Sequence, residues 1–224
     1  MIKAVIFDLD DTLISERKYI ESGYRHISKL LSSKLEKNEF DLYELLIKLF
    51  SQSPKNVFNR LFDTLNKPYT KSDILELVEE YRNHIPLIEF YIDVLPCLEM
   101  LKEKGLKLGI ITDGYAIAQR QKLEAVQAFE LFDEIIVTDE LGREYWKPHV
   151  KAFELMKERL NIEFNEMIYV GDNPEKDFHI GAQYPVHTIR IYREGVYKDS
   201  YYLNDIRENF SIHSLNELDL IIGR

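Results

Sequence analysis

The chain has 224 residues and carries 39 acidic against 29 basic side chains, which gives a net charge of −10. A chain of this length buries roughly 70% of its unfolded surface and accommodates one domain plus a sizeable insert or a second small domain. The negative charge argues against nonspecific binding to nucleic acid or to an anionic membrane. Cys97 is the only cysteine, which excludes an intrachain disulfide and a thiolate metal site.

The chain starts directly with a short apolar run and lacks the apolar stretch of a signal peptide. No later window reaches the ~18 apolar residues of a membrane span. We therefore expect a soluble, cytoplasmic protein that acts on a small molecule and has no nucleic-acid or membrane partner. Its oligomeric state is open at this point.

The first apolar run ends at Phe7 and opens into Asp8-Leu9-Asp10-Asp11-Thr12. If the extended geometry persists past Phe7, strand alternation places the Asp8 and Asp10 side chains on the same side of the chain. Two clustered carboxylates call for a cation, and a hard oxygen site of this kind suits Mg²⁺, which shares its remaining positions with waters and a phosphate. The motif therefore favours phosphoryl transfer. The simpler alternative is an acidic turn that caps the following segment.

Residues 16–84 have the three- and four-residue apolar spacing that is typical of amphipathic helices. Two helix starts are indicated, one by Ser53 before Pro54 and one by Thr70 with Asp73 three residues later, an acidic variant of the capping box. We expect four helices, whose apolar positions are Tyr24, Ile27 and Leu31; Leu42, Leu45, Leu46 and Leu49; Val57, Leu61 and Leu65; and Ile74, Leu77, Val78 and Tyr81.

The rest of the chain alternates between two kinds of segment. Short apolar, β-branched runs at 106–112, 134–138, 167–171 and 186–191 resemble the first run and predict buried parallel strands. Between them we expect helices at about 96–104, 115–128, 148–160 and 174–183, three of them with a proline at the first helical position, namely Pro96, Pro148 and Pro174. This order predicts an α/β class.

The expected fold is a Rossmann-like, doubly wound parallel sheet with an inserted helical-bundle subdomain. The core would comprise residues 1–15 and 85–224, and the helical subdomain residues 16–84. In such sheets ligands bind at the carboxyl ends of the strands, and several expected strands end in polar residues.

The polar residues at these strand ends suit a phosphate and a metal. Thr112-Asp113-Gly114 combines a hydroxyl with a glycine turn that enters a helix, whose backbone N–H groups can cradle a phosphate. Lys147 lies just before another helix and could neutralise phosphoryl oxygens. Gly171 permits a close approach, Asp172 is expected to face the site, and Asp177 lies close behind. This acidic loop indicates a metal.

Taken together, Asp8-x-Asp10-x-Thr12, Thr112, Lys147 and Gly171-Asp172-x4-Asp177 resemble, in this order, the motifs of the haloacid dehalogenase superfamily of phosphatases. The resemblance spans nearly the whole chain, and the helical insert lies where that family carries a helical cap, between the first strand and the first core helix. It implies a Mg²⁺-dependent phosphatase that hydrolyses a small phosphomonoester, such as a sugar phosphate or a nucleoside monophosphate.

The resemblance also implies a role for each residue. Asp8 is the nucleophile that takes the phosphoryl group as an aspartyl phosphate. Asp10 protonates the leaving oxygen and then activates water as a base. The metal is held by the carboxylates of Asp8 and Asp172 and by the Asp10 backbone carbonyl. A second aspartate also favours phosphoryl transfer over dehalogenation, because a halide leaves without a proton.

The remaining motif residues surround the phosphate. The resemblance implies that Thr112 hydrogen-bonds a phosphoryl oxygen and that Lys147 offsets the developing charge, with Asp177 orienting water or Lys147 from behind. Asp113 departs from the asparagine common at this position in the family. Together with Gly114 it is assigned to substrate binding, although its side chain could simply face away.

Three other functions are compatible with these residues. A phosphomutase would return the phosphoryl group from the aspartyl phosphate to a second hydroxyl instead of to water. A phosphorelay receiver also combines acidic residues, a hydroxyl and a lysine at strand ends, but its phosphorylated aspartate follows the third strand. A non-catalytic binding module would keep the fold without turnover, and the intact motifs argue against it.

Overall fold

The structure is a computed structural model that describes residues 1–195, 197, 200 and 202–223. It divides into two compact units. The α/β unit comprises Met1–Glu16 with Ile88–Arg224, and the helical unit comprises Arg17–Leu87. Each unit has its own hydrophobic core.

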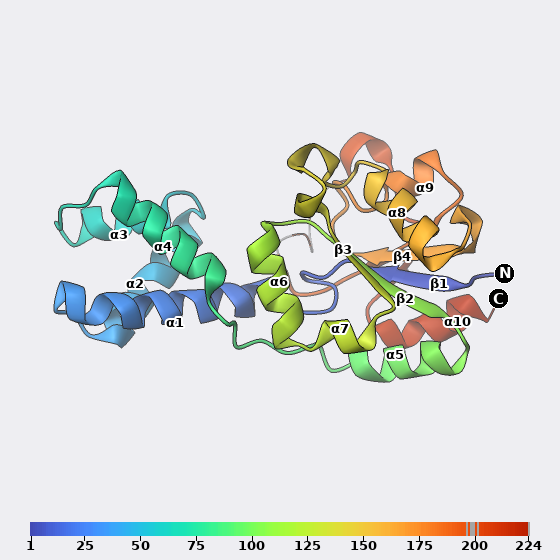
Figure 1. Cartoon of the computed structure of the whole chain (residues 1–224), viewed down its shortest axis with the longest axis horizontal. Coiled ribbons are helices and arrows are strands. Elements are labelled where there is room, and N and C mark those ends of the chain that lie inside the picture. Colours follow the sequence, from blue (N-terminus) through green and yellow to red (C-terminus); the bar gives the residue numbers. More distant parts are fainter. Residues whose placement is uncertain (196, 198–199, 201, 224) are drawn as a thin grey trace. The chain divides into compact units, whose positions relative to one another are not determined.

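The α/β unit contains one six-stranded sheet with the strand order β3-β2-β1-β4-β5-β6, in which every pairing is parallel (Figure 1). Phe7, near the end of the central strand β1, pairs with Ile110 of β2 and Val170 of β4. This order reverses direction between β1 and β4, which is the switch point where open α/β sheets bind ligands. The strands are β1 (Ala4–Phe7), β2 (Lys107–Thr112), β3 (Glu134–Val137), β4 (Met167–Gly171), β5 (His187–Ile191) and β6 (Phe210–Ile212).

Helices cover both faces of this sheet, as Figure 1 shows. Alternate residues of β1 point to opposite sides, so Val5 packs in the core beneath α5 and α10, and Ile6 packs in the core beneath α8 and α9. The predicted doubly wound α/β class is confirmed. The helices of this unit are α5 (Val94–Glu103), α6 (Ala116–Ala125), α7 (Ala128–Leu131), α8 (Lys151–Leu160), α9 (His179–Gln183) and α10 (Leu218–Ile222).

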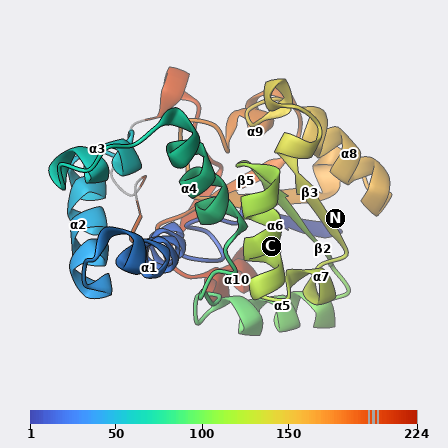
Figure 2. The ribbon, with the colours of Figure 1, turned by 60° about the vertical axis from the view of Figure 1, so that its left-hand side comes forward.

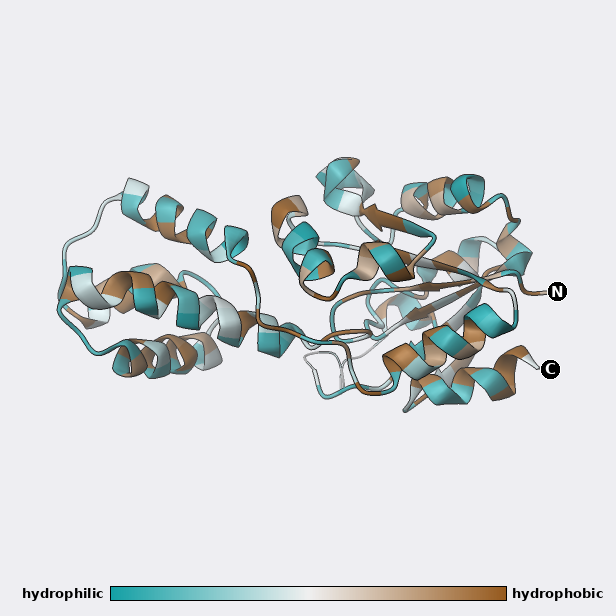
Figure 3. Cartoon of the chain, turned by 60° about the horizontal axis from the view of Figure 1, so that its bottom comes forward, coloured by the Kyte–Doolittle hydropathy of each residue, from teal (hydrophilic) through white to brown (hydrophobic). Residues whose placement is uncertain are grey.

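The helical unit consists of α1 (Glu16–Leu35, whose first residue belongs to the α/β unit), α2 (Glu39–Gln52), α3 (Val57–Thr64) and α4 (Lys71–Asn83) (Figure 2). Its core contains fully buried Ile27, Leu46 and Leu61. The brown stripes on these helices in Figure 3 are the apolar faces that the three- and four-residue spacing predicts. None of the described helices has the length and apolar character that a membrane crossing requires.

One of the two predicted helix starts in this unit is confirmed. Thr70 caps α4 and forms a reciprocal capping box with Asp73. The start at Ser53 is wrong, because Ser53 ends α2 and its hydroxyl accepts a hydrogen bond from Lys55 N–H in a local turn. Helix α3 begins after Asn56, which adopts a left-handed conformation with φ +53°.

The predictions of a proline at the first helical position are also wrong. Pro96 is the third residue of α5, where its missing N–H costs no helical bond. Pro148 lies three residues before Lys151, the first residue of α8. Pro174 lies in a turn before α9, and the Asp177 carboxylate accepts a hydrogen bond from Asn173 N–H within this turn.

Two further differences concern the ends of elements. The helix predicted over 115–128 stops at Ala125, because Gln127 has a left-handed φ of +55° and separates α6 from α7. The sixth strand, β6, was not expected. It has three residues, of which only Ile212 is buried, so it carries no alternating pattern that a sequence could reveal.

Phe153 of α8 offers a test of the core packing. Its ring is 1% exposed and meets the Tyr169 ring edge-on at 4.9 Å between centroids. We expect Phe153→Ala to lower the free energy of unfolding of the α/β unit by about 3–5 kcal/mol, because it opens a cavity beside the sheet. Fluorescence of Trp146, the only tryptophan, reports on this unit during urea unfolding. The control is Phe129→Ala at a 39%-exposed ring, with an expected change below about 1 kcal/mol; equal losses would contradict the prediction.

Candidate active site

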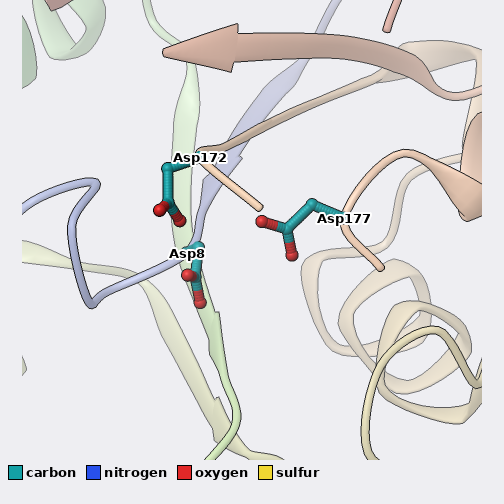
Figure 4. A group of neighbouring side chains, drawn as sticks. All are labelled: Asp8, Asp172 and Asp177. Atoms are coloured by element: carbon teal, nitrogen blue, oxygen red, sulfur yellow. The ribbon is translucent and has the colours of Figure 1, made fainter. Parts of the chain in front are cut away.

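Three carboxylates converge at the carboxyl ends of β1 and β4 (Figure 4). Asp8 follows β1, Asp172 follows β4, and Asp177 belongs to the turn after β4. One oxygen of each lies within 4.8 Å of the other two, and all three side chains are buried. The parallel register of β1 and β4 brings Asp8 and Asp172 together, since Phe7 pairs with Val170 and the two aspartates follow the strands within one residue of the same level.

Lys147 neutralises part of this acidic cluster. Its Nζ donates to Asp8 Oδ1 at 2.7 Å and to Tyr169 Oη at 2.8 Å, and lies 2.9 Å from Asp177 Oδ1. Its side chain has no exposed area. Burial acts to lower the pKa of Lys147, but Asp177 and Asp8 outweigh it and raise the pKa well above the ordinary value. The ammonium group thus has two hydrogen bonds and a second ion pair, with Asp177.

Asp177 and Asp172 differ in how their oxygens are used. Asp177 Oδ1 faces Lys147, and Oδ2 accepts a hydrogen bond from Asn173 N–H at 3.0 Å. A Cβ at Gly171 would collide with this carboxylate, so glycine permits the approach. Among the residues that the structure describes, Asp172 has no hydrogen-bond or ion-pair partner for its side chain, although it is 6% exposed.

The electrostatics of this cluster fit a bound cation. Burial is the largest cause that raises the pKa of Asp8 to about 6, with Asp177 adding to it and Lys147 opposing it. Burial, followed by the charges of Asp177, Asp8 and Asp11, raises the pKa of Asp172 well above its ordinary value. Buried carboxylates in excess over lysines are the donor set that a hard divalent cation stabilises. Asp8 and Asp172 are the two with oxygens available to it.

Asp113 follows β2, and its carboxylate is fully engaged by the protein. Oδ1 accepts from the Thr138 hydroxyl at 2.7 Å and from Lys147 N–H at 3.1 Å, and Oδ2 accepts from Lys176 Nζ at 2.7 Å. The side chain is 4% exposed. Burial would raise the pKa of Asp113, but Lys147 and Lys176 with the hydrogen bonds lower it. Its side chain therefore holds two lysines rather than lying open to a ligand.

Asp10 lies outside the three-carboxylate cluster. Its carboxylate is bound by two residues of α6, with Lys122 Nζ at 2.7 and 2.8 Å from the two oxygens and Gln119 Nε2 at 2.9 Å from Oδ2. Gln119 Nε2 also donates to the Thr112 hydroxyl. The structure thus joins Asp10 and Thr112, predicted from separate motifs, through one glutamine. Gly114 has φ +136°, and a Cβ there would meet the Gln119 side chain at 2.9 Å.

Sequence reasoning missed four residues of this site: Gln119, Lys122, Tyr169 and Lys176. A signal existed for the first two, because they lie on the buried face of α6 beside Ala118 and Leu123. A buried lysine at three-residue spacing from a buried glutamine is unusual unless both have partners. Tyr169 lies within an apolar strand and gives no such signal.

Comparison with known proteins places this arrangement in a family. Residues 5–191 match the family described as haloacid dehalogenase-like hydrolase. The chain belongs to the haloacid dehalogenase-like hydrolases. It is similar to the glyceraldehyde 3-phosphate phosphatase of Methanocaldococcus jannaschii, with 32% identity over 97% of this chain and 96% of that protein.

Two further similarities extend over nearly the whole hydrolase. The pyrophosphatase PpaX of Bacillus anthracis is 27% identical over 99% of this chain and 97% of that protein. The crystal structure of a haloacid dehalogenase (HAD) phosphatase from Thermococcus onnurineus has 27% identity and a TM-score of 0.64, and covers 99% of this chain and 98% of that one. The predicted family, fold class and phosphatase activity are confirmed.

The raised pKa of Asp8 in this hydrolase predicts a pH-dependent stability in EDTA. Because the pKa is raised from 3.8 to about 6, the folded state binds the proton more tightly, so the stability from this group is present below pH 3.8 and is lost as the pH rises through about 6. Asp8→Asn removes this loss. We expect its unfolding free energy relative to wild type to rise by on the order of 1–3 kcal/mol between pH 4 and 7.5 in urea titrations.

Asp113→Asn is the matched control, because the pKa of Asp113 is lowered instead. Its ionised form stabilises the folded state, and this stability is lost only as the pH falls below about 3.8, so between pH 4 and 7.5 the unfolding free energy of this variant relative to wild type should stay nearly level. A rise as large as that of Asp8→Asn over the same pH range would contradict the assignment.

Proposed function

We propose that this phosphatase is a Mg²⁺-dependent phosphomonoester hydrolase that works through an aspartyl phosphate on Asp8. The observation that carries the proposal is the pairing of Asp8 with the fully buried Lys147 at 2.7 Å, beside the Asp172 carboxylate, which has no ion-pair partner in the described part of the chain. A nucleophilic carboxylate needs a nearby cation to accept the charge of an incoming phosphoryl group, because phosphoryl transfer is catalysed mainly by positioning and charge stabilisation.

In the first half-reaction an Asp8 oxygen attacks phosphorus, and the bond from phosphorus to the ester oxygen breaks. Lys147 offsets the charge on the phosphoryl oxygens from its place beside Asp8. The Thr112 hydroxyl accepts from Gln119, which is a donor at Nε2, and so keeps its own proton for a phosphoryl oxygen. Asp10 gives a proton to the leaving ester oxygen.

In the second half-reaction Asp10 acts as a base and takes a proton from water, whose oxygen attacks phosphorus and releases Asp8. Asp177 holds Lys147 in place through its 2.9 Å contact. Asp113 positions the Lys147 backbone and Lys176 instead of touching substrate. Gly114 provides the tight turn from β2 into α6.

The carboxylates of Asp8 and Asp172, with the Asp10 backbone carbonyl, would hold the Mg²⁺. When bound, Mg²⁺ supplies charge neutralisation for the phosphoryl group and for the two carboxylates. The raised pKa values of Asp8 and Asp172 support this proposal, because burial and the neighbouring acids oppose the ionised forms and a bound cation would favour them.

For the substrate we propose a small phosphorylated metabolite, with triose and other sugar phosphates before nucleoside monophosphates. The name of the M. jannaschii relative, glyceraldehyde 3-phosphate phosphatase, supports this order. We also propose that the helical unit serves as the family's cap, since it is inserted between β1 and α5. The cytoplasmic setting stays a prediction.

The test is phosphate release from glyceraldehyde 3-phosphate, pyrophosphate, nucleoside monophosphates and p-nitrophenyl phosphate, each with Mg²⁺ or with EDTA. We expect Mg²⁺-dependent release that falls by about 10³-fold or more in Asp8→Asn, because the variant lacks the nucleophile. Asp63→Asn, at an exposed position of the helical unit, should match wild type.

Three results would contradict the proposal: full activity in EDTA, full activity of Asp8→Asn, or no release from any ester. Stoichiometric release of inorganic phosphate from a sugar phosphate would exclude a phosphomutase. A long-lived phosphoprotein formed from acetyl phosphate, without steady turnover, would favour a receiver.

A further inference from the structure

Two residues of α6, Gln119 and Lys122, bind the carboxylate of Asp10 through hydrogen bonds, and we call this pair the α6 clasp. Lys122 Nζ lies 2.7 Å from Oδ1 and 2.8 Å from Oδ2, and Gln119 Nε2 lies 2.9 Å from Oδ2. Gln119 is 1% exposed and Lys122 is 3% exposed. Two long polar side chains are therefore buried on one helix with a common partner in the loop after β1.

The clasp fixes the rotation of the Asp10 carboxylate, because its contacts are unequal. An ionised carboxylate has about four acceptor positions, two on each oxygen. Among the described residues, Oδ2 accepts from both clasp residues, whereas Oδ1 accepts only from Lys122. Oδ1 is therefore the oxygen with a position left for a proton. A single ion pair would leave the carboxylate free to turn, and the glutamine removes that freedom.

The clasp also ties this rotation to the phosphate-binding residue. Gln119 Nε2 donates to the Thr112 hydroxyl as well as to Asp10. The approach of Gln119 requires that residue 114 has no Cβ, since a Cβ on Gly114 would meet the glutamine side chain at 2.9 Å. The end of β2, the start of α6 and the loop after β1 are thus coupled at one side chain.

We propose that Gln119 and Lys122 are positioning residues for the proton transfers of Asp10, and that the clasp matters most for substrates with poor leaving groups. This inference rests on the proposed function. As the Asp8–phosphorus bond forms and the ester bond breaks, the Asp10 proton moves to the leaving oxygen. An alkoxide leaves poorly without that proton, whereas p-nitrophenolate leaves without it. The clasp therefore directs this hydrolase toward alkyl phosphates.

A purely structural ion pair makes a different prediction. If the Lys122–Asp10 pair only stabilised the fold, its loss would lower the rate for every substrate alike. If the clasp positions Asp10, its loss lowers kcat/KM for alkyl phosphates selectively, because kcat/KM with a good leaving group reports an Asp8 attack that needs little acid assistance.

The experiment compares kcat/KM for glyceraldehyde 3-phosphate and for p-nitrophenyl phosphate in Lys122→Met and Gln119→Leu. We expect Lys122→Met to lower the alkyl value by about 10- to 100-fold, because small misplacements of a catalytic group cost on that order, and the aryl value by less than about threefold. Gln119→Leu should lower the alkyl value more than the aryl value, with a rise in KM for both because Thr112 also loses its partner. Lys122→Arg should recover part of the alkyl activity.

Gln121→Leu is the matched control, since Gln121 lies on the same helix outside its buried set, and the hydrogen bonds to Asp10 among the described residues come from Gln119 and Lys122 instead. It should leave both values unchanged, and thermal unfolding in the presence of Mg²⁺ shows whether each variant is folded. The functional link between Lys122 and Asp10 is tested with the double variant that carries Lys122→Met and Asp10→Asn. A residue that acts through Asp10 causes no further loss of alkyl activity in that background.

Equal losses for both substrates, no loss for either, or an additive loss in the Asp10→Asn background would overturn the inference. None of these results bears on Asp8, whose own substitution tests the hydrolase mechanism. Inactivity of Asp8→Asn together with a substrate-independent effect of Lys122→Met would uphold the proposed function and reject the clasp.

Discussion

The contacts of the buried Lys147 ammonium group are the interaction on which the rest of the site depends. A charge with no exposed area is tolerated only when partners surround it, and three side-chain oxygens do so: those of Asp8 after β1, Tyr169 within β4 and Asp177 after β4. Asp8 lies 139 residues from Lys147 in the sequence. The sheet is needed to bring these side chains together. Lys147 in turn offsets much of the electrostatic repulsion between the Asp8 and Asp177 carboxylates.

The same arrangement recurs across the carboxyl edge of the sheet. Asp8 is matched with Lys147, Asp10 with Lys122, and Asp113 with Lys176. Each pair joins a strand end to a different helix or turn, so these charges also hold the loops together. Asp172 is the exception among the described residues, because no lysine pairs with it. That imbalance explains why the site fits a divalent cation.

The sequence predicted much of this fold because its signals are local. Short β-branched runs mark β1 to β5, and the three- and four-residue spacing marks α1 to α4. These local signals did not predict the elements whose form depends on tertiary contacts. The proline before α9 lies in a turn that aims the Asp177 carboxylate, and β6 forms only because β5 is there to pair with it. The helix predicted to end at residue 128 ends earlier, because Gln127 adopts a left-handed conformation that has no sequence signature.

By itself the sequence determined the family, the α/β class, the phosphatase chemistry and the carboxylates that gather at the strand ends, because motif spacing and periodicity are properties of the chain. Only the tertiary structure decided which acid meets which lysine. The Asp113 carboxylate holds two lysines, and the Asp10 carboxylate is bound from α6 by Gln119 and Lys122. The reason is physical: a buried charge takes the partner that packing brings within hydrogen-bond distance, and sequence separation does not encode that distance.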